Sequence, residues 1–214
     1  MENGNSNNKN PFAALKRFAS QRVNVEHCEL CNLEIPEIHS HLIEPPTRRL
    51  VCACQACSIL FDNEGETKYK RVPYRGRYLE NFQLTDVQWN SLAIPIQLAF
   101  FFKSSPEEKV VALYPSPAGA TESLLALDSW SEIVAENPIL EEMNPDVEAL
   151  LVYRVADIRE YYIAPIDKCF ELVGLIRANW SGLSGGTLVW REINKFFTEL
   201  QKTSLKTKGV AKNA

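Results

Sequence analysis

The sequence predicts an α+β fold in which a small cysteine-rich module packs on a larger mixed domain. Eight of the nine cysteines and histidines fall within residues 27–57, which indicates a local module. The rest of the chain mixes strand-like apolar runs with amphipathic helical segments, without the regular alternation of a parallel α/β sheet. With 214 residues, of which 45% are hydrophobic, the chain is long enough to bury a core without covalent cross-links.

Residues 1–22 are expected to form a disordered tail followed by a short amphipathic helix. The first ten residues, MENGNSNNKN, are polar and lack the apolar stretch of a signal peptide. Residues 11–22 carry apolar side chains at helical spacing. We therefore expect a cytoplasmic protein with reduced thiols.

Two Cys-x2-Cys pairs, Cys28 with Cys31 and Cys54 with Cys57, predict a metal site in residues 23–66. Two residues between cysteines allow one tight turn to direct both sulfurs at the same ion, and the turn's N–H groups can stabilise the thiolates. We expect these four residues to hold Zn²⁺ in a tetrahedral four-cysteine site. Iron is the alternative, because four thiolates also suit iron.

The segment between the pairs predicts the shape of the module. Residues 38–43 and 48–53 read as the two strands of a hairpin joined by a Pro-Pro turn. Residues 54–61 read as a short helix whose last three residues, 59–61, face a core. A turn, a hairpin and a helix bearing the second pair form a treble-clef arrangement. A zinc ribbon, with the second pair on a hairpin, is the alternative.

Three further side chains leave the metal chemistry open. Either Cys52 or Cys54 could complete the ligand set, and the two-residue gap to the last cysteine favours Cys54. Cys52 is then a spare thiol beside the metal or a core residue. His39 and His41 alternate on a strand and therefore point to the same side, where they could build a second metal site or a hydrolytic centre.

Residues 39–45 (HSHLIEP) and 50–58 (LVCACQACS) resemble the histidine strand and cysteine segment of treble-clef His-Asn-His nucleases. Ser58 stands where a metal-binding histidine of that family usually follows the last cysteine, and residues 44–51 contain no asparagine. The resemblance implies, as an alternative function, a metal-dependent hydrolase or nuclease of degenerate type that uses the two histidines.

Residues 67–203 are expected to form the α+β domain, and residues 204–214 a flexible basic tail. Thr85 or Asp86, Asp128 and Asp167 are expected to cap three of the helices. In chain order we expect a strand pair at 68–78, a helix at 85–92, strands at 94–103 and 110–114, a helix at 128–136, strands at 147–155 and 161–164, and helices from 167 to 180 and after 186.

Two loops could carry a ligand. Ser116, Gly119 and Thr121 lie in a small, hydroxyl-rich loop that leaves a predicted strand. Gly185 and Gly186 precede a predicted helix, whose first N–H groups can bind an anion. No lysine follows these glycines, so the second loop is not a Walker loop. Ordinary connections are the alternative for both.

The charge pattern disfavours nucleic acid, and the hydropathy pattern disfavours a membrane span. Residues 122–160 hold ten acidic side chains against two arginines, which would repel a phosphate backbone. The best apolar run, residues 94–102, is too short to cross a bilayer and contains Pro95 and Gln97. We expect no nucleic-acid partner and no membrane span.

Most of the chain between Glu26 and Leu200 resembles an uncharacterised bacterial family encoded in gene clusters for nickel–iron hydrogenases. The segments that carry the likeness are residues 28–31, 50–57, 94–102, 114–123, 144–153 and 165–177. The resemblance implies a helper of a metalloenzyme. We therefore expect a non-catalytic zinc-binding accessory protein whose partner is a hydrogenase component or maturation factor. An iron-binding redox protein is the second alternative, after the hydrolase.

Overall fold

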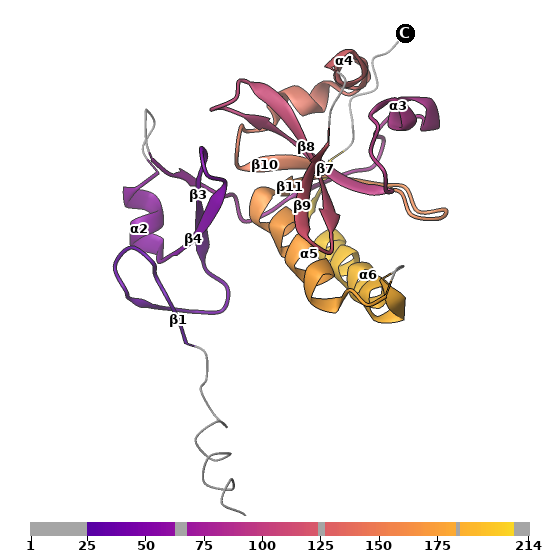
Figure 1. Cartoon of the computed structure of the whole chain (residues 1–214). Helices are drawn as coiled ribbons and strands as arrows, with labels where there is room; N and C mark the ends of the chain where they lie inside the picture. Colours follow the sequence, from indigo (N-terminus) through magenta and orange to yellow (C-terminus); the bar gives the residue numbers. More distant parts are fainter. Residues whose placement is uncertain (1–24, 63–67, 124–126, 183–184, 208–214) are drawn as a thin grey trace, which may run out of the picture.

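The computed structural model describes residues 25–62, 68–123, 127–182 and 185–207 of the chain, which is mixed α+β as expected (Figure 1). The tail and helix expected in residues 1–22 lie outside the described residues. The amino-terminal elements are β1 (Glu26–His27), β2 (Glu34–Ile35), β3 (Ser40–Glu44), β4 (Arg49–Ala53), α2 (Gln55–Leu60) and β5 (Lys70–Arg71). The remaining elements are β6 (Arg77–Leu79), α3 (Asp86–Ser91), β7 (Leu98–Ser104), β8 (Lys109–Ser116), β9 (Gly119–Ser123), α4 (Leu127–Glu136), η1 (Pro138–Glu142), β10 (Glu148–Tyr153), β11 (Glu160–Pro165), α5 (Ile166–Asn179), α6 (Gly186–Thr203) and β12 (Leu205–Thr207).

A seven-stranded sheet in the order β12-β6-β11-β10-β7-β8-β9 organises the larger domain. Neighbouring strands are antiparallel, except that β12 runs parallel to β6. The central strand β10 is buried along its whole length. In β7, Phe100 and Phe102 point to one side of the sheet, whereas Ala99 and Phe101 point to the other. Both faces therefore require a covering layer.

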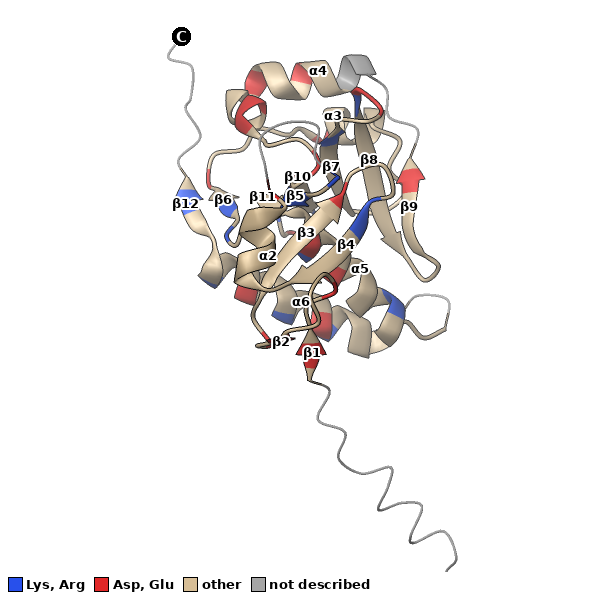
Figure 2. Ribbon diagram, turned by 90° about the vertical axis from the view of Figure 1, so that its left-hand side faces the viewer, with Lys and Arg blue, Asp and Glu red and all other residues tan. Residues whose placement is uncertain are grey.

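Helices cover both faces of this sheet (Figure 1). On one face, α5 and α6 lie side by side, and the Phe197 ring of α6 stacks on Tyr153 of β10 with 4.1 Å between ring centroids. On the other face lie α3, α4 and η1, and Trp130 of α4 stacks on Phe101 at 5.3 Å. Thr85 caps α3 in a capping box, as its position before the helix predicted. Figure 2 shows acidic residues recurring along α4.

The amino-terminal module has its own two small sheets. Strands β4, β3 and β5 form a three-stranded antiparallel sheet, β1 pairs with β2, and α2 follows β4 directly. The expected strand pair at 68–78 is divided, because β5 joins the module while β6 joins the large sheet. Strand β5 therefore adds to the module's sheet along the edge of β3, beyond residue 66.

The module is docked on the sheet domain through apolar and charged contacts. Ile43 and Val72 belong to the same buried cluster as the sheet and α5. The Lys70 ammonium lies 2.6 Å from the Asp146 carboxylate, which is almost fully buried and also accepts a hydrogen bond from the Ser105 N–H. A buried carboxylate needs such partners to remain charged. The module and the domain are thus tied together at specific points.

The three residues expected in the core at the end of α2 are on the surface. Ile59, Leu60 and Phe61 are 56%, 64% and 39% exposed, whereas Cys57 and Ser58 of the same helix are buried. Within this six-residue helix the inward positions are taken by Cys57 and Ser58, three and four residues after Cys54, and Phe61 follows the end of the helix. The prediction that residues 59–61 face a core was wrong.

The carboxyl-terminal boundary also differs from the expectation. Residues 205–207 form β12, whose register places Leu205 opposite Arg77 and Thr207 opposite Leu79. The edge of β6 offers unpaired backbone groups, and β12 satisfies them. Ordered structure therefore continues past residue 203, and residues 208–214 of the expected tail lie outside the described residues. Within the described ranges, none of the helices combines the length and apolar character needed to cross a membrane.

We predict that Phe101→Ala destabilises the protein by about 3–5 kcal/mol, because it leaves a cavity in the centre of the sheet. Phe101 is fully buried, and its ring contacts the rings of Trp89 and Trp130. Urea denaturation measures the change. Val87→Ala, at an exposed position of α3, is the control and should change stability by less than about 0.5 kcal/mol. A loss below about 1 kcal/mol for Phe101→Ala would contradict the assigned core.

Candidate metal centre

The first cysteine pair lies on the turn between β1 and β2. The Cys28 N–H donates to the Leu33 carbonyl at 2.8 Å, and the Asn32 N–H donates to the Cys28 carbonyl at 2.8 Å. Asn32 has φ 61°, a left-handed conformation that asparagine adopts more easily than most residues. This tight turn places both sulfurs of the pair on one side.

The second pair opens α2. Cys54 is the N-cap residue, and its sulfur accepts a hydrogen bond from the Cys57 N–H at 3.4 Å. The Ser58 N–H donates to the Cys54 carbonyl at 2.9 Å, which starts the helix. The helix start therefore positions both sulfurs of the pair.

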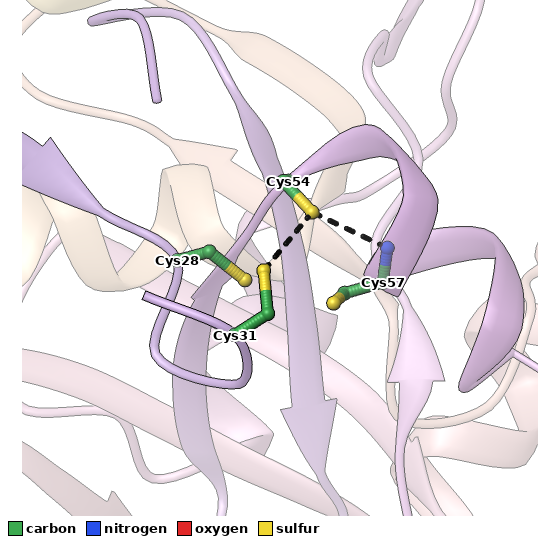
Figure 3. A group of neighbouring side chains, drawn as sticks. All are labelled: Cys28, Cys31, Cys54 and Cys57. Carbon is green, nitrogen blue, oxygen red and sulfur yellow. Dashed lines mark hydrogen bonds between the residues drawn. The ribbon is translucent and has the colours of Figure 1, made fainter. Parts of the chain in front are cut away.

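The four sulfurs of Cys28, Cys31, Cys54 and Cys57 converge (Figure 3). All lie within 4.8 Å of one another, and the Cys31 and Cys54 sulfurs are 3.7 Å apart. Four sulfurs at about 2.3 Å from a tetrahedral ion are separated by about 3.8 Å, whereas a disulfide brings them to about 2.05 Å. All four are free thiols. The group can hold a metal ion.

Ionisation of all four cysteine sulfurs at neutral pH requires a nearby cation. Burial opposes ionisation of Cys28, but backbone hydrogen bonds from Cys54, Cys31 and Leu30 outweigh it and lower the Cys28 pKa to about 6. Burial and hydrogen bonds with the neighbouring sulfurs raise the Cys57 pKa to about 12. Like charges this close repel one another. Without a cation only part of the group is ionised at neutral pH, whereas a bound metal allows four thiolates.

Cys52, His39 and His41 form a separate group. The Cys52 sulfur and one nitrogen of each imidazole lie within 4.8 Å of one another. Cys52 is directly opposite His41 in the β3–β4 pairing. Of the two cysteines that the spacing left open, Cys54 lies with the sulfur group and Cys52 lies with the histidines.

The two predicted ligand loops are built from internal contacts. In the β8–β9 hairpin the Ser116 hydroxyl donates to the Gly119 carbonyl at 2.9 Å, and the Thr121 hydroxyl donates to the Ser116 hydroxyl at 3.1 Å. Gly185 is the N-cap of α6, and its carbonyl accepts from the Ser181 N–H at 3.1 Å. Gly186 follows it with φ 75°. Ligand binding at these loops stays a prediction.

Sequence reasoning missed three carboxylates beside the cysteine and histidine groups. Glu29 accepts the Cys52 N–H at 2.9 Å, and its own N–H donates to the Cys52 carbonyl at 2.9 Å. Asp167, expected as a helix cap, lies in the first turn of α5 and accepts from His41 at 2.9 Å. Glu26 lies 3.3 Å from His39. Glu29 could have been suspected from its position inside the first Cys-x2-Cys pair. Asp167 gave no such signal, because it is distant in sequence from His41.

Residues 27–204 match a family described as "Family of unknown function (DUF5947)". The chain belongs to this family. No curated protein and no solved structure matches the chain. The family match spans residues of both the module and the sheet domain.

Between about pH 7 and about pH 9 we predict that the apparent metal affinity of the cysteine group rises at least about tenfold per pH unit. In this range Cys28 is already a thiolate, whereas Cys57, with its pKa raised to about 12, must release a proton when it binds the ion. Competition with a chelator of known pH dependence measures the affinity. An affinity independent of pH would contradict binding through Cys57.

Proposed function

We propose that Cys28, Cys31, Cys54 and Cys57 hold a structural zinc ion and that the chain is a non-catalytic accessory protein that acts by binding another protein. The observation that carries the proposal is the convergence of four sulfurs within 4.8 Å. Four cysteine ligands fill a tetrahedral ion and leave no position for a substrate, as in structural zinc sites. Such an ion stabilises a fold and does not perform chemistry.

The order of elements supports zinc in a treble-clef arrangement. A cysteine turn between β1 and β2, the hairpin β3–β4 and the helix α2 with the second pair follow one another along the chain. A zinc ribbon would carry the second pair on a hairpin, whereas here it begins a helix. Small modules with paired Cys-x2-Cys motifs usually bind zinc, and iron is the competing ion because four thiolates suit both.

The outer side of α2 supports binding to a protein. Ile59, Leu60 and Phe61 form a consecutive exposed apolar segment, which we call the α2 patch. Exposed apolar groups of this kind mark contact surfaces more often than scattered single residues do. The α2 patch is fixed to the ion through Cys57 on the inward stripe of the same helix. The proposed partner is a component or maturation factor of a nickel–iron hydrogenase, as the family resemblance implies.

Cys57→Ser is predicted to abolish zinc binding and to make the module sensitive to protease. An apparent binding free energy of about 10–16 kcal/mol is typical of structural zinc, and little else would hold so small a core together. Elemental analysis and limited proteolysis measure the two effects. Cys169→Ala is the control, because Cys169 is buried among the residues of the sheet domain.

Two outcomes would count against the zinc proposal. A soluble, metal-free Cys57→Ser protein with an unchanged melting curve would show that the ion has no structural role. Bound iron with visible absorption in anaerobically purified protein would favour the redox alternative over zinc.

The partner proposal predicts that a tagged chain co-purifies a nickel–iron hydrogenase component from its native host and that Ile59→Asp abolishes this. A carboxylate in the centre of an apolar contact loses its hydration on binding, so association should weaken at least about tenfold. Val87→Asp is the matched control, since Val87 is an exposed apolar residue on the six-residue helix α3. Equal recovery with both variants would refute a role for the α2 patch.

A further inference from the structure

We propose that His39, His41 and Cys52 form a second binding site for a divalent transition-metal ion, separate from the four-cysteine group. Their three candidate ligand atoms lie within 4.8 Å of one another, and none of these residues belongs to the other group. The imidazole rings of the two histidines meet edge to face with 4.7 Å between centroids. This site lies where the module meets the sheet domain, because His41 contacts Asp167 of α5.

His39 presents a buried nitrogen that has no hydrogen-bond partner. Its Nδ1 lies 2.9 Å from the Pro36 carbonyl oxygen and 3.3 Å from a Glu26 carboxylate oxygen. Both oxygens can only accept, so Nδ1 carries a proton, and in the neutral imidazole Nε2 carries a lone pair. The His39 side chain is 6% exposed, and Nε2 finds no donor. Buried polar atoms rarely lack a hydrogen-bond partner, and a bound metal ion would give His39 Nε2 a partner.

His41 is oriented in the way that metal-binding histidines usually are. Its Nδ1 lies 2.9 Å from the Asp167 Oδ2 atom. The carboxylate accepts a hydrogen bond from the Nδ1–H group, which leaves Nε2 as the ligand atom and fixes the plane of the ring. Both histidines are therefore held in the same tautomer, in which an oxygen fixes Nδ1 and Nε2 can act as the ligand atom.

Cys52 supplies the third ligand from the neighbouring strand. Residues directly opposite in an antiparallel pair share a face, and Cys52 is opposite His41. Both backbone groups of Cys52 are engaged by Glu29, through two hydrogen bonds of 2.9 Å. The strand is therefore fixed at this residue. Ideal tetrahedral separations are about 3.3–3.6 Å, and the three ligand atoms here all lie within 4.8 Å of one another.

The donor set and its surroundings define the class of ion. Two imidazole nitrogens and one thiolate suit zinc and related transition ions and do not suit magnesium or calcium. The carboxylates of Glu26 and Asp167 contact the histidines and add negative charge. Three protein ligands leave a fourth position for water or another small ligand, as in zinc sites that perform chemistry. The proposal adds to the zinc proposal for the four cysteines and does not depend on it.

Metal counting on the reduced full-length chain tests the second site. Zinc or cobalt is added in excess, unbound metal is removed, and bound metal is measured per chain. We expect about two equivalents for the original sequence and about one for His41→Ala and for Cys52→Ser. His27→Ala is the matched control, since His27 is the third histidine of the chain and is exposed. Circular dichroism checks that each variant is folded.

Cobalt spectra separate the two sites. Removing Cys52 should lose one thiolate-to-cobalt charge-transfer contribution and leave the four-thiolate spectrum unchanged. One equivalent bound by the original sequence, retained in His41→Ala and Cys52→Ser, would overturn the second site. Loss of both ions from folded Cys52→Ser protein would also overturn it, because the two groups would then be a single site. Failure of Cys57→Ser to lose an ion would instead count against the four-cysteine site alone.

Discussion

The close approach of four cysteine sulfurs is the constraint on which the amino-terminal structure depends. Three of the four cysteines belong to the buried core of the module, which otherwise contains only a few aliphatic residues. So small a core cannot offset the conformational entropy of ordering the chain. A cation bound by all four sulfurs would attract four thiolates and would take the place of a larger core.

The cysteine group is connected to the rest of the protein by backbone and side-chain contacts. Glu29, between the first two cysteines, holds both backbone groups of Cys52 on β4. Across the hairpin lies His41, and its imidazole contacts Asp167 in the first turn of α5. Ile43 of the same strand enters the main core. Through these contacts, the conformation of the turn that carries Cys28 and Cys31 influences how the module packs against the sheet domain.

Local patterns in the sequence were sufficient for the four-cysteine group and for most helices and strands. The Cys-x2-Cys spacing depends only on a tight turn or on the first turn of a helix, and the capping box at Thr85 depends on a residue three positions away. Long-range pairings could not be predicted in this way. Nothing near residue 70 or residue 205 reveals which strand edge each segment will fill. Asp167 was assigned only as a helix cap, because its partner His41 is distant in sequence and the contact between them could not be predicted.

If the module can dock on the sheet domain and separate from it, the histidine group can influence the orientation of the α2 patch. The proposed second ion would bind well only when Asp167 on the sheet domain orients His41 on the module. A ligand that binds one arrangement stabilises that arrangement by an amount that grows with its concentration relative to its dissociation constant. Metal at this junction would therefore favour the docked module and fix the direction in which the α2 patch faces a partner. The same ion would serve no such purpose on an independent module, which gives a physical reason for the two parts of the chain to occur together.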